Sequence, residues 1–498
     1  MTSPLERARR FEIEHERAIA GRSRPAFHLS ARVGWMNDPN GFSFYGGQYH
    51  LFYQYHPYDS HWGPMHWGHA VTSDLLHWEY LPCALAPDMP YDDKGCFSGT
   101  AVVLPDGRHA LMYTGVSEVP GPDGLPRQVQ TQNLAFGDGV NYEKYAGNPV
   151  ITAADLPTGG SPFDFRDPKL YACADGRFRC LVANDRLDGS GRHLGGQLLM
   201  FESDDMVHWR LASVPAQNPG RLGMMWECPE LFSLDGEDVL LISAQDLLPE
   251  RLEYHNGNVA LCLLGRYDPQ SGRFDARADH AVDYGIDFYA PQTILTGDGR
   301  RVMIGWMQNW DTCALPLDTA PWFGQMSLPR ELSVKNGRLY QWPIRELDAL
   351  RGACVEHKNV LVADGEIALE GVRGRTVDME IDIKPEGEIF TRFELIFAAD
   401  ADHRTSLGFR PRESTLKIDR KFSGSRRAII HQRRAEVNHA GGRLRMRLIL
   451  DRRSAEVFVN GGEKALSATL ATPLSSDGIR FFCDGQCRVS VKCWELKV

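Results

Sequence analysis

Residues 38–47 read DPNGFSFYGG, in which an acidic residue and a proline open a strand that runs into the turn Tyr45-Gly46-Gly47. The same plan, with a small or acidic residue and often a proline at its start, recurs four more times. Successive copies begin 60, 69, 61 and 62 residues apart. Units of this length are typical of four-stranded propeller blades with long connections. The copies begin with Asp38-Pro39-Asn40-Gly41, Ser98-Gly99-Thr100-Ala101, Asp167-Pro168-Lys169-Leu170, Cys228-Pro229-Glu230-Leu231 and Ala290-Pro291-Gln292-Thr293.

A second marker runs out of phase with the first and places an aspartate a few positions before an aromatic residue. Its aspartates lie 64, 67 and 63 residues apart, so the two markers share one period. This agreement favours a five-bladed β-propeller over a β-sandwich with coincidental spacing. We therefore predict an all-β fold with a propeller over residues 26–347. The four pairs are Asp74 and Trp78, Asp138 and Tyr142, Asp205 and Trp209, and Asp268 and Phe274.

The chain changes character after Leu347, where both markers stop. Runs such as Leu416-Lys417-Ile418-Asp419 alternate apolar and polar residues, as half-buried strands do. Residues 455–459 read as a strand that enters a tight hairpin at Asn460-Gly461. We predict a C-terminal β-sandwich over residues 360–498, and a helical surface extension over the charged residues 1–25.

The composition of the chain limits the classes of molecule that it is expected to bind and the compartment in which it is expected to act. The formal charge of -10 argues against a nucleic-acid binder, which neutralises phosphates with clustered Lys and Arg. No stretch has the apolar length needed to cross a membrane, and the N-terminus lacks the apolar segment of a secretory signal. The eleven cysteines show irregular spacing without paired CxxC motifs. We expect a cytoplasmic protein with reduced thiols and a neutral small-molecule partner such as a sugar; its oligomeric state is not predicted.

Three carboxylates occur at or next to the repeat position, namely Asp38, Asp167 and Glu227. Equivalent positions of successive blades form a ring around the propeller axis, so these side chains are expected to converge. Alone, each has a structural interpretation: NDPNG is a turn sequence, Arg166-Asp167 is a potential ion pair, and Glu227 is a potential rim carboxylate. Their shared position favours a catalytic cluster, because a retaining glycosidase needs two carboxyl groups about 5 to 5.5 Å apart.

The residues around these acids resemble the motifs of the invertase and fructanase family, glycoside hydrolase family 32. The main matches are WMNDPNG at 35–41, FRDP at 165–168 and WECP at 226–229. This resemblance implies a five-bladed propeller joined to a β-sandwich. Further matches are FYQY at 52–55, WG at 62–63, WGH at 67–69, FSG at 97–99, DFYA at 287–290 and SLPREL at 327–332.

The resemblance also implies roles for the three acids. Asp38 would be the nucleophile that forms a covalent fructosyl intermediate, Glu227 the acid and base, and Asp167 the transition-state stabiliser. We expect burial and the charge of Asp38 to raise the pKa of Glu227, while Asp38 stays ionised. Arg166 would orient Asp167, and no metal or cofactor is implied. The fructose pocket would be lined by Asn37, Gln54, Trp62, Phe97 and Ser98, and Arg166 would also belong to the substrate-binding residues.

The function expected from these features is exo-acting hydrolysis of the terminal β-fructofuranosyl bond of sucrose or short fructo-oligosaccharides. Three alternatives stay open: a sucrose-6-phosphate hydrolase, fructosyl transfer to another sugar, and a non-catalytic sugar-binding propeller. A phosphorylated substrate would require a cationic contact beyond the fructose pocket. We interpret the metal-like residues His61, His66 and His69 as structural, and Cys228 as a support for the neighbouring acids rather than a nucleophile.

Overall fold

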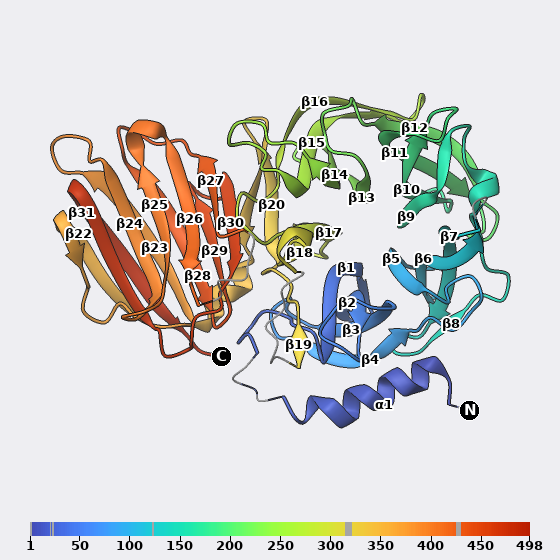
Figure 1. Ribbon diagram of the computed structural model, residues 1–498, viewed down its shortest axis with the longest axis horizontal. Helices are drawn as coiled ribbons and strands as arrows, with labels where there is room; N and C mark the ends of the chain where they lie inside the picture. The colour runs from blue at the N-terminus through green and yellow to red at the C-terminus, as the bar shows by residue number, and fades with distance from the viewer. Residues whose placement is uncertain (1, 20, 22–23, 122–123, 314–320, 425–429) are drawn as a thin grey trace.

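The computed structural model describes residues 2–498 except 20, 22–23, 122–123, 314–320 and 425–429. It consists of a ring of β-sheets, a curled second sheet beside the ring, and an N-terminal helix (Figure 1). The predicted all-β fold, a five-bladed propeller followed by a β-sandwich, is confirmed. Helix α1 (Pro4–Glu16) packs against the outer strand of the first blade. It begins with a capping box formed by Ser3 and Glu6.

Each blade of the described ring is a meander of four antiparallel strands. The short strand β19 (Trp322–Phe323), from a connection within the fifth blade, pairs with the start of the first blade and links the two ends of the ring. The blades are β1 (Gly34–Tyr45), β2 (Gln48–His56), β3 (His66–Thr72) and β4 (Glu79–Leu85); β5 (Gly95–Val103), β6 (His109–Pro120), β7 (Pro126–Gly137) and β8 (Tyr142–Lys144); β9 (Gly160–Ala172), β10 (Phe178–Leu187), β11 (His193–Ser203) and β12 (Arg210–Gln217); β13 (Trp226–Leu234), β14 (Glu237–Leu247), β15 (Gly257–Asp268) and β16 (Arg273–Ala281); and β17 (Tyr289–Leu295), β18 (Arg301–Trp306), β20 (Arg330–Lys335) and β21 (Arg338–Pro343).

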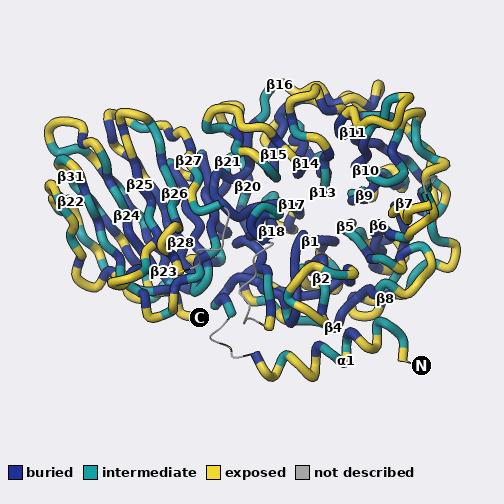
Figure 2. Tube along the Cα trace, viewed as in Figure 1, coloured by how far each residue is buried: buried dark blue, intermediate teal, exposed yellow. Residues whose placement is uncertain are grey.

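The first strand of every blade lies innermost and contacts the first strand of the next blade around the ring. All five of these strands are largely buried (Figure 2). Each has a register shift at its repeat position, and the backbone takes a positive φ at Asp167, Cys228 and Ala290. A bulge bends the strand and re-aims its side chain. The repeat motif therefore marks a bulge that faces the propeller axis five times.

The second marker corresponds to the turn between the third and fourth strands of a blade. The Asp74 carboxylate accepts hydrogen bonds from the backbone N–H groups of Leu76 and His77. Asp205 makes the same turn in the third blade, and the partner aromatics Trp78 and Trp209 pack against hydrophobic clusters of their blades. An aspartate that caps its own turn explains why this residue recurs with the blade.

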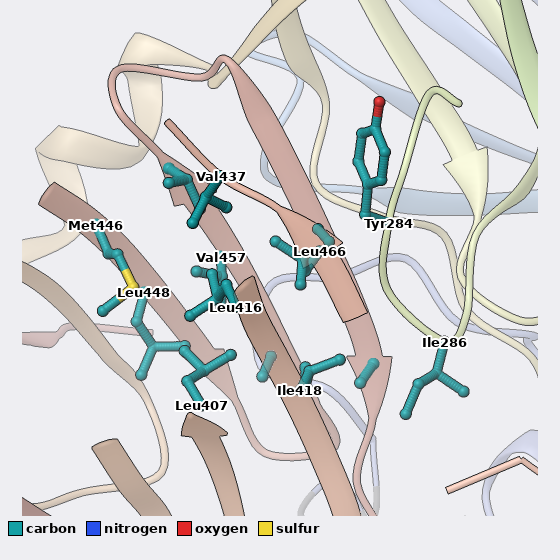
Figure 3. Packing of buried hydrophobic residues seen from close by; sticks show 14 of the residues in the cluster. Tyr284, Ile286, Leu407, Leu416, Ile418, Val437, Met446, Leu448, Val457 and Leu466 are labelled. Atoms are coloured by element: carbon teal, nitrogen blue, oxygen red, sulfur yellow. The ribbon is translucent and has the colours of Figure 1, made fainter. Parts of the chain in front are cut away.

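The second domain is a continuous sheet of ten strands within the described residues. Its long strand β31 (Gly478–Leu496) pairs with β24 through its first half and with β23 through its second half, so the sheet curls into two layers. Apolar side chains fill the space between the layers (Figure 3). The first strand of this sheet begins at Arg351, before the boundary at residue 360 that the sequence predicted for the second domain. The remaining strands are β22 (Arg351–Ile367), β23 (Val377–Pro385), β24 (Arg392–Ala399), β25 (Arg404–Arg410), β26 (Thr415–Phe422), β27 (Gln432–Glu436), β28 (Leu444–Asp451), β29 (Ser454–Val459) and β30 (Lys464–Thr469).

Buried ion pairs join the two domains. Arg330 of the propeller contacts Glu456 of β29 at 2.6 Å and is 1% exposed. His28 lies between Asp451 and Glu456, and although burial opposes its charge, hydrogen bonds to these two acids raise the pKa of His28 to about 9. Removing one partner from such a network leaves a buried charge without compensation and strongly destabilises the folded protein. The network therefore holds the two domains in one arrangement.

Short helical segments complete the described chain: α2 (Trp310–Cys313) near the propeller axis, and the 3-10 turns Ala153–Asp155, Arg345–Leu350 and Pro411–Glu413. Among the described helices, none is both long and apolar enough to span a membrane.

Candidate active site

Asp38, Asp167 and Glu227 converge from strands β1, β9 and β13 of three different blades. The contacts of Cys228, the residue after Glu227, show how close Asp38 and Asp167 lie to each other. Its backbone N–H donates to Asp167 Oδ2 at 3.0 Å, and its Sγ is 3.8 Å from Asp38 Oδ2 and 3.6 Å from Asp167 Oδ2. The predicted convergence of the three acids therefore exists in the structure, and the Cys228 thiol packs between two of them.

Asp38 is 8% exposed, and its two carboxylate oxygens differ in their hydrogen bonds. Its Oδ2 accepts a hydrogen bond from Ser98 Oγ at 3.4 Å, whereas its buried Oδ1 has no hydrogen-bond partner among the described residues. A buried oxygen without a partner is unusual in a native protein and is often found at a functional site. Oδ1 thus has no partner among the described residues and is shielded from solvent, so Asp38 is held less firmly than a fully bonded carboxylate.

The cluster of three acids bears directly on the charge of Asp38. Burial, together with the charges of Glu227 and Asp167, raises the pKa of Asp38 to about 7. The reason is that a second and a third carboxylate face a group that is already removed from water. The expectation that Asp38 stays ionised is thus a prediction that the pH profile has to test. Burial and the charge of Glu227 also raise the pKa of Asp167.

Glu227 is held by two donors from neighbouring blades. Arg166 Nε donates to Oε1 at 3.0 Å, and the Tyr289 hydroxyl donates to Oε2 at 2.8 Å. Arg166 is itself fixed by Asp164 at 3.0 Å. The hydrogen bonds of Arg166 go to Glu227 and Asp164 and not to Asp167, which takes its hydrogen bond from the Cys228 N–H. The charge of Arg166 still acts on Asp167 and opposes the rise in its pKa.

The other predicted pocket residues lie between the first and second blades. Asn37 is 3% exposed and accepts a hydrogen bond from Trp35 Nε1 at 2.7 Å, so its amide is fixed. Gln54 is also buried and donates to the Cys96 carbonyl at 3.1 Å. Trp62 meets the edge of the Phe97 ring at 6.1 Å between centroids and is 47% exposed, which places an open aromatic face beside the pocket.

Sequence reasoning missed Tyr289 as a site residue. A signal for it exists, because each blade brings the residue just before its repeat position to the site: Asn37, Phe97, Arg166, Glu227 and Tyr289. Trp306 and Trp310, which the sequence offers as candidates for the rim of the leaving-group site or for interblade packing, belong to an aromatic cluster: Trp35 stacks on Phe323 and Trp310, and Trp310 meets Trp306 edge to face at 5.0 Å.

The axis beneath the acids is filled. Gln292 donates to the Gly99 carbonyl at 2.9 Å, and Thr100 donates to the Pro168 carbonyl at 2.9 Å. Lys169 pairs with Glu230 at 2.8 Å. The space left here is a cavity of about 10 Å³, which holds at most one water molecule. The site is therefore closed at this end.

The candidate metal residues do not share a site. His61 pairs with Asp59 on the surface, His66 bonds the Pro64 carbonyl, and His69 bonds His50. A different group, Asp164, Asp185 and His193, is close enough to hold a metal ion. Its members are already bonded to Arg166 or to each other, so nothing in their geometry demands a metal.

Comparison with known proteins assigns the chain to a family. The Glycosyl hydrolases family 32 N-terminal domain matches residues 28–343, and the C-terminal domain of the same family matches residues 346–495. The chain is a member of glycoside hydrolase family 32. Among relatives of this family 32 enzyme, it is 35% identical to the raffinose invertase of Escherichia coli over 457 residues, with 90% of this chain and 89% of that protein covered. It is 34% identical to a sucrose-6-phosphate hydrolase of Escherichia coli, with 90% and 89% covered.

The fold of this family 32 enzyme is shared with a β-fructofuranosidase of Bombyx mori. The two are 33% identical, with a TM-score of 0.83 over 99% of this chain and 98% of that chain. A variant of the Bombyx mori protein has been solved in complex with sucrose. The present chain is accordingly a glycoside hydrolase of the β-fructofuranosidase type. Two carboxyl groups in different environments are what hydrolysis by this class requires.

Proposed function

We propose that the protein is a retaining, exo-acting β-fructofuranosidase that releases terminal fructose from sucrose or short fructo-oligosaccharides. The observation that carries this proposal is that two converging acids are held differently. Asp38 accepts only a long hydrogen bond from Ser98 Oγ at 3.4 Å and a contact from the Cys228 thiol, whereas both oxygens of Glu227 are held by donors. A nucleophile must be able to move towards the substrate carbon, and an acid and base needs a fixed direction.

In the first step, Glu227 donates its proton to the glycosidic oxygen while the Asp38 carboxylate attacks the anomeric carbon of fructose. The bond to the leaving sugar breaks, and a covalent fructosyl-Asp38 ester forms. In the second step, Glu227 takes a proton from water, which attacks the same carbon and releases Asp38. Asp167 accepts hydrogen bonds from fructose hydroxyls, and these bonds strengthen as positive charge develops on the ring.

Because Gln292, Thr100 and the Lys169–Glu230 pair fill the axis beneath the acids, a substrate enters from the opposite end of the propeller. We expect its terminal fructosyl unit to be the one that reaches Asp38, and a comparison of the products released from kestose and from inulin tests this exo action. Asn37, Gln54, Phe97 and Ser98 surround this unit, and the open face of Trp62 covers its C–H surface.

The roles are tested with Asp38→Ala and Glu227→Ala on sucrose. We expect turnover to fall by at least about 10³-fold in each variant, since each removes a group that acts in the chemical step. Proton NMR of the first product is expected to show the β-anomer of fructose. Parent-like rates in both variants, or an inverted first product, would overturn the assignment.

Leaving-group preference is tested with a panel of sucrose, sucrose 6-phosphate, kestose, inulin and levan, ranked by kcat/KM. We expect sucrose and kestose to rank first. The same panel tests the sucrose-6-phosphate alternative, which the Escherichia coli relative of that name favours. Product analysis at high sucrose separates hydrolysis from fructosyl transfer.

All eleven cysteines are unpaired, and most are buried. Free thiols in this number are typical of a reducing compartment, and we propose that the enzyme acts in the cytoplasm. Fractionation of the native host, with activity measured in each fraction, tests this proposal.

A further inference from the structure

Asp287 is a fully buried carboxylate between the propeller and the second domain. Its Oδ2 accepts hydrogen bonds from Arg420 Nη1 at 2.5 Å, from the Thr469 backbone N–H at 2.7 Å and from Thr469 Oγ1 at 2.8 Å. Its Oδ1 accepts one from Thr312 Oγ1 at 3.1 Å. Arg420 belongs to β26 and Thr469 to β30, so the second domain supplies most of the donors to this acid.

The chain around Asp287 is docked on the edge of the second domain. The backbone N–H groups of Tyr284 and Ile286 donate to the carbonyls of Ala465 and Ser467 in β30, at 2.8 and 2.7 Å. Figure 3 shows Tyr284 and Ile286 on the propeller segment that faces Leu466. This segment therefore runs alongside β30 before it enters the innermost strand of the fifth blade.

Two residues after Asp287, the chain reaches the site. Strand β17 begins at Tyr289, whose hydroxyl donates to Glu227 Oε2 at 2.8 Å. The direction of the Tyr289 side chain depends on where β17 begins. Asp287 fixes the start of β17 against the second domain. A shift of Asp287 therefore moves Tyr289, whose hydroxyl donates to Glu227.

Asp287 also contacts the residues of the site through its hydrogen bond with Thr312. Thr312 lies in α2, whose Trp310 contacts Trp35 and Trp306. Cys313 of the same helix packs in one hydrophobic cluster with Tyr289 and Cys228. Asp287 thus fixes both the aromatic cluster around Trp310 and the Tyr289 hydroxyl relative to the second domain.

We propose that Arg420 of the second domain is a positioning residue for the reaction, acting through Asp287 on Tyr289 and on α2. The proposal rests on the proposed function, since it concerns the geometry of Glu227. Arg420 touches no reacting atom. A displacement of about 1 Å of a catalytic group lowers rates by up to about a hundredfold, so the anchor is expected to affect turnover strongly.

The experiment compares Arg420→Gln, Arg420→Lys and Thr469→Val with the control Arg447→Gln in the full chain. Arg447 is a matched residue: it is 4% exposed, lies in β28 of the same domain and pairs with Asp378 and with Asp348 in the segment between the domains. We expect Arg420→Gln to lower kcat for sucrose about ten- to a hundredfold, with less than a threefold change in KM. Arg420→Lys recovers part of this loss. Arg447→Gln lowers Tm but leaves kcat within about twofold.

Two readouts separate positioning from general loosening of the interface. Near-UV circular dichroism of the tryptophan cluster is expected to weaken alike in Arg420→Gln and in Thr469→Val, whereas Arg447→Gln is expected to change only the contribution of Trp342, whose ring the Arg447 guanidinium covers at 5.4 Å. The alkaline limb of the pH profile of kcat is expected to move in Arg420→Gln, and not to move further when Arg420→Gln is added to Tyr289→Phe. If Arg420→Gln is insoluble, Thr469→Val, which keeps the residue's shape, carries the same expectations.

Equal losses of kcat in Arg420→Gln and Arg447→Gln, or a parent-like kcat in Arg420→Gln, overturn the positioning role. Neither result touches the proposed function, which fails if Asp38→Ala and Glu227→Ala both keep parent-like rates or if the first product is inverted. The circular dichroism signal tests the anchor even if the parent enzyme prefers another fructoside.

Discussion

Tyr289 of the fifth blade donates a hydrogen bond to Glu227 of the fourth blade, with 2.8 Å between the hydroxyl and Oε2. Together with Arg166 Nε at 3.0 Å, it occupies both oxygens of this carboxyl group from the two adjacent blades. The direction of the acid and base is thus set by neighbouring blades rather than by its own strand.

Removal of this hydroxyl in Tyr289→Phe is expected to lower kcat about tenfold, with a smaller change in KM. The physical reason is that Glu227 loses one of the two donors that fix its direction. The measurement is kcat and KM for sucrose from pH 4 to 9. Tyr171→Phe is the control, because the half-buried Tyr171 hydroxyl accepts from the Leu231 N–H away from the site. A parent-like kcat in Tyr289→Phe would contradict the role of this contact.

The raised pKa of Asp38, about 7, sets the acid limb of kcat/KM for the free enzyme. The nucleophile must be ionised to attack, so kcat/KM is expected to fall tenfold per pH unit well below pH 7. Initial rates at sucrose concentrations far below KM measure this quantity. A profile that stays flat down to pH 5 would show that Asp38 is ionised in the free enzyme.

Asp38 is also expected to be destabilising at neutral and alkaline pH. An acid with a raised pKa keeps its proton in the native state but not in the unfolded state between about pH 4 and 7, so stability falls as pH rises through that range. Asp38→Asn removes the charge and keeps the shape. We expect it to raise stability by on the order of 1 to 4 kcal/mol at pH 8 and by less at pH 5, since one pKa unit is about 1.4 kcal/mol. Thermal unfolding at both pH values, with Asp59→Asn as an exposed control, measures the difference. A gain that is equal at both pH values would argue against charge repulsion as its cause.

Cys228 touches two of the acids, yet it is not expected to act in the reaction. Burial and the neighbouring acids raise the pKa of the Cys228 thiol far above its usual range, so it stays neutral. Cys228→Ala keeps the backbone N–H that donates to Asp167. We expect kcat within about tenfold of the parent value, because only packing between the acids is lost. Abolished turnover in a folded Cys228→Ala variant would reopen the case for a thiol nucleophile.

The sequence predicted the propeller and the convergence of Asp38, Asp167 and Glu227 because the repeat motif encodes a local feature, a bulge in each innermost strand. The partners of these acids follow from longer-range geometry. Arg166 and Asp167 are neighbours in sequence, but Arg166 bonds Glu227 of the next blade, which no motif reveals. The raised pKa of Asp38 depends on burial by three blades. Arg420 and Thr469, which donate to Asp287, lie in another domain, more than a hundred residues away in sequence.

The central claim is that Asp38 carries the fructosyl group between two steps that Glu227 catalyses. Its most direct test is rapid quenching of Glu227→Gln with an activated β-fructofuranoside, followed by mass spectrometry of the peptide that contains Asp38. In this variant the activated leaving group departs without an acid, while no base assists the attack of water, so the intermediate accumulates. We predict that this peptide gains the mass of one anhydrofructosyl unit, and that Asp38→Asn shows no such gain. A label on another residue, or turnover without any labelled peptide, would contradict the account.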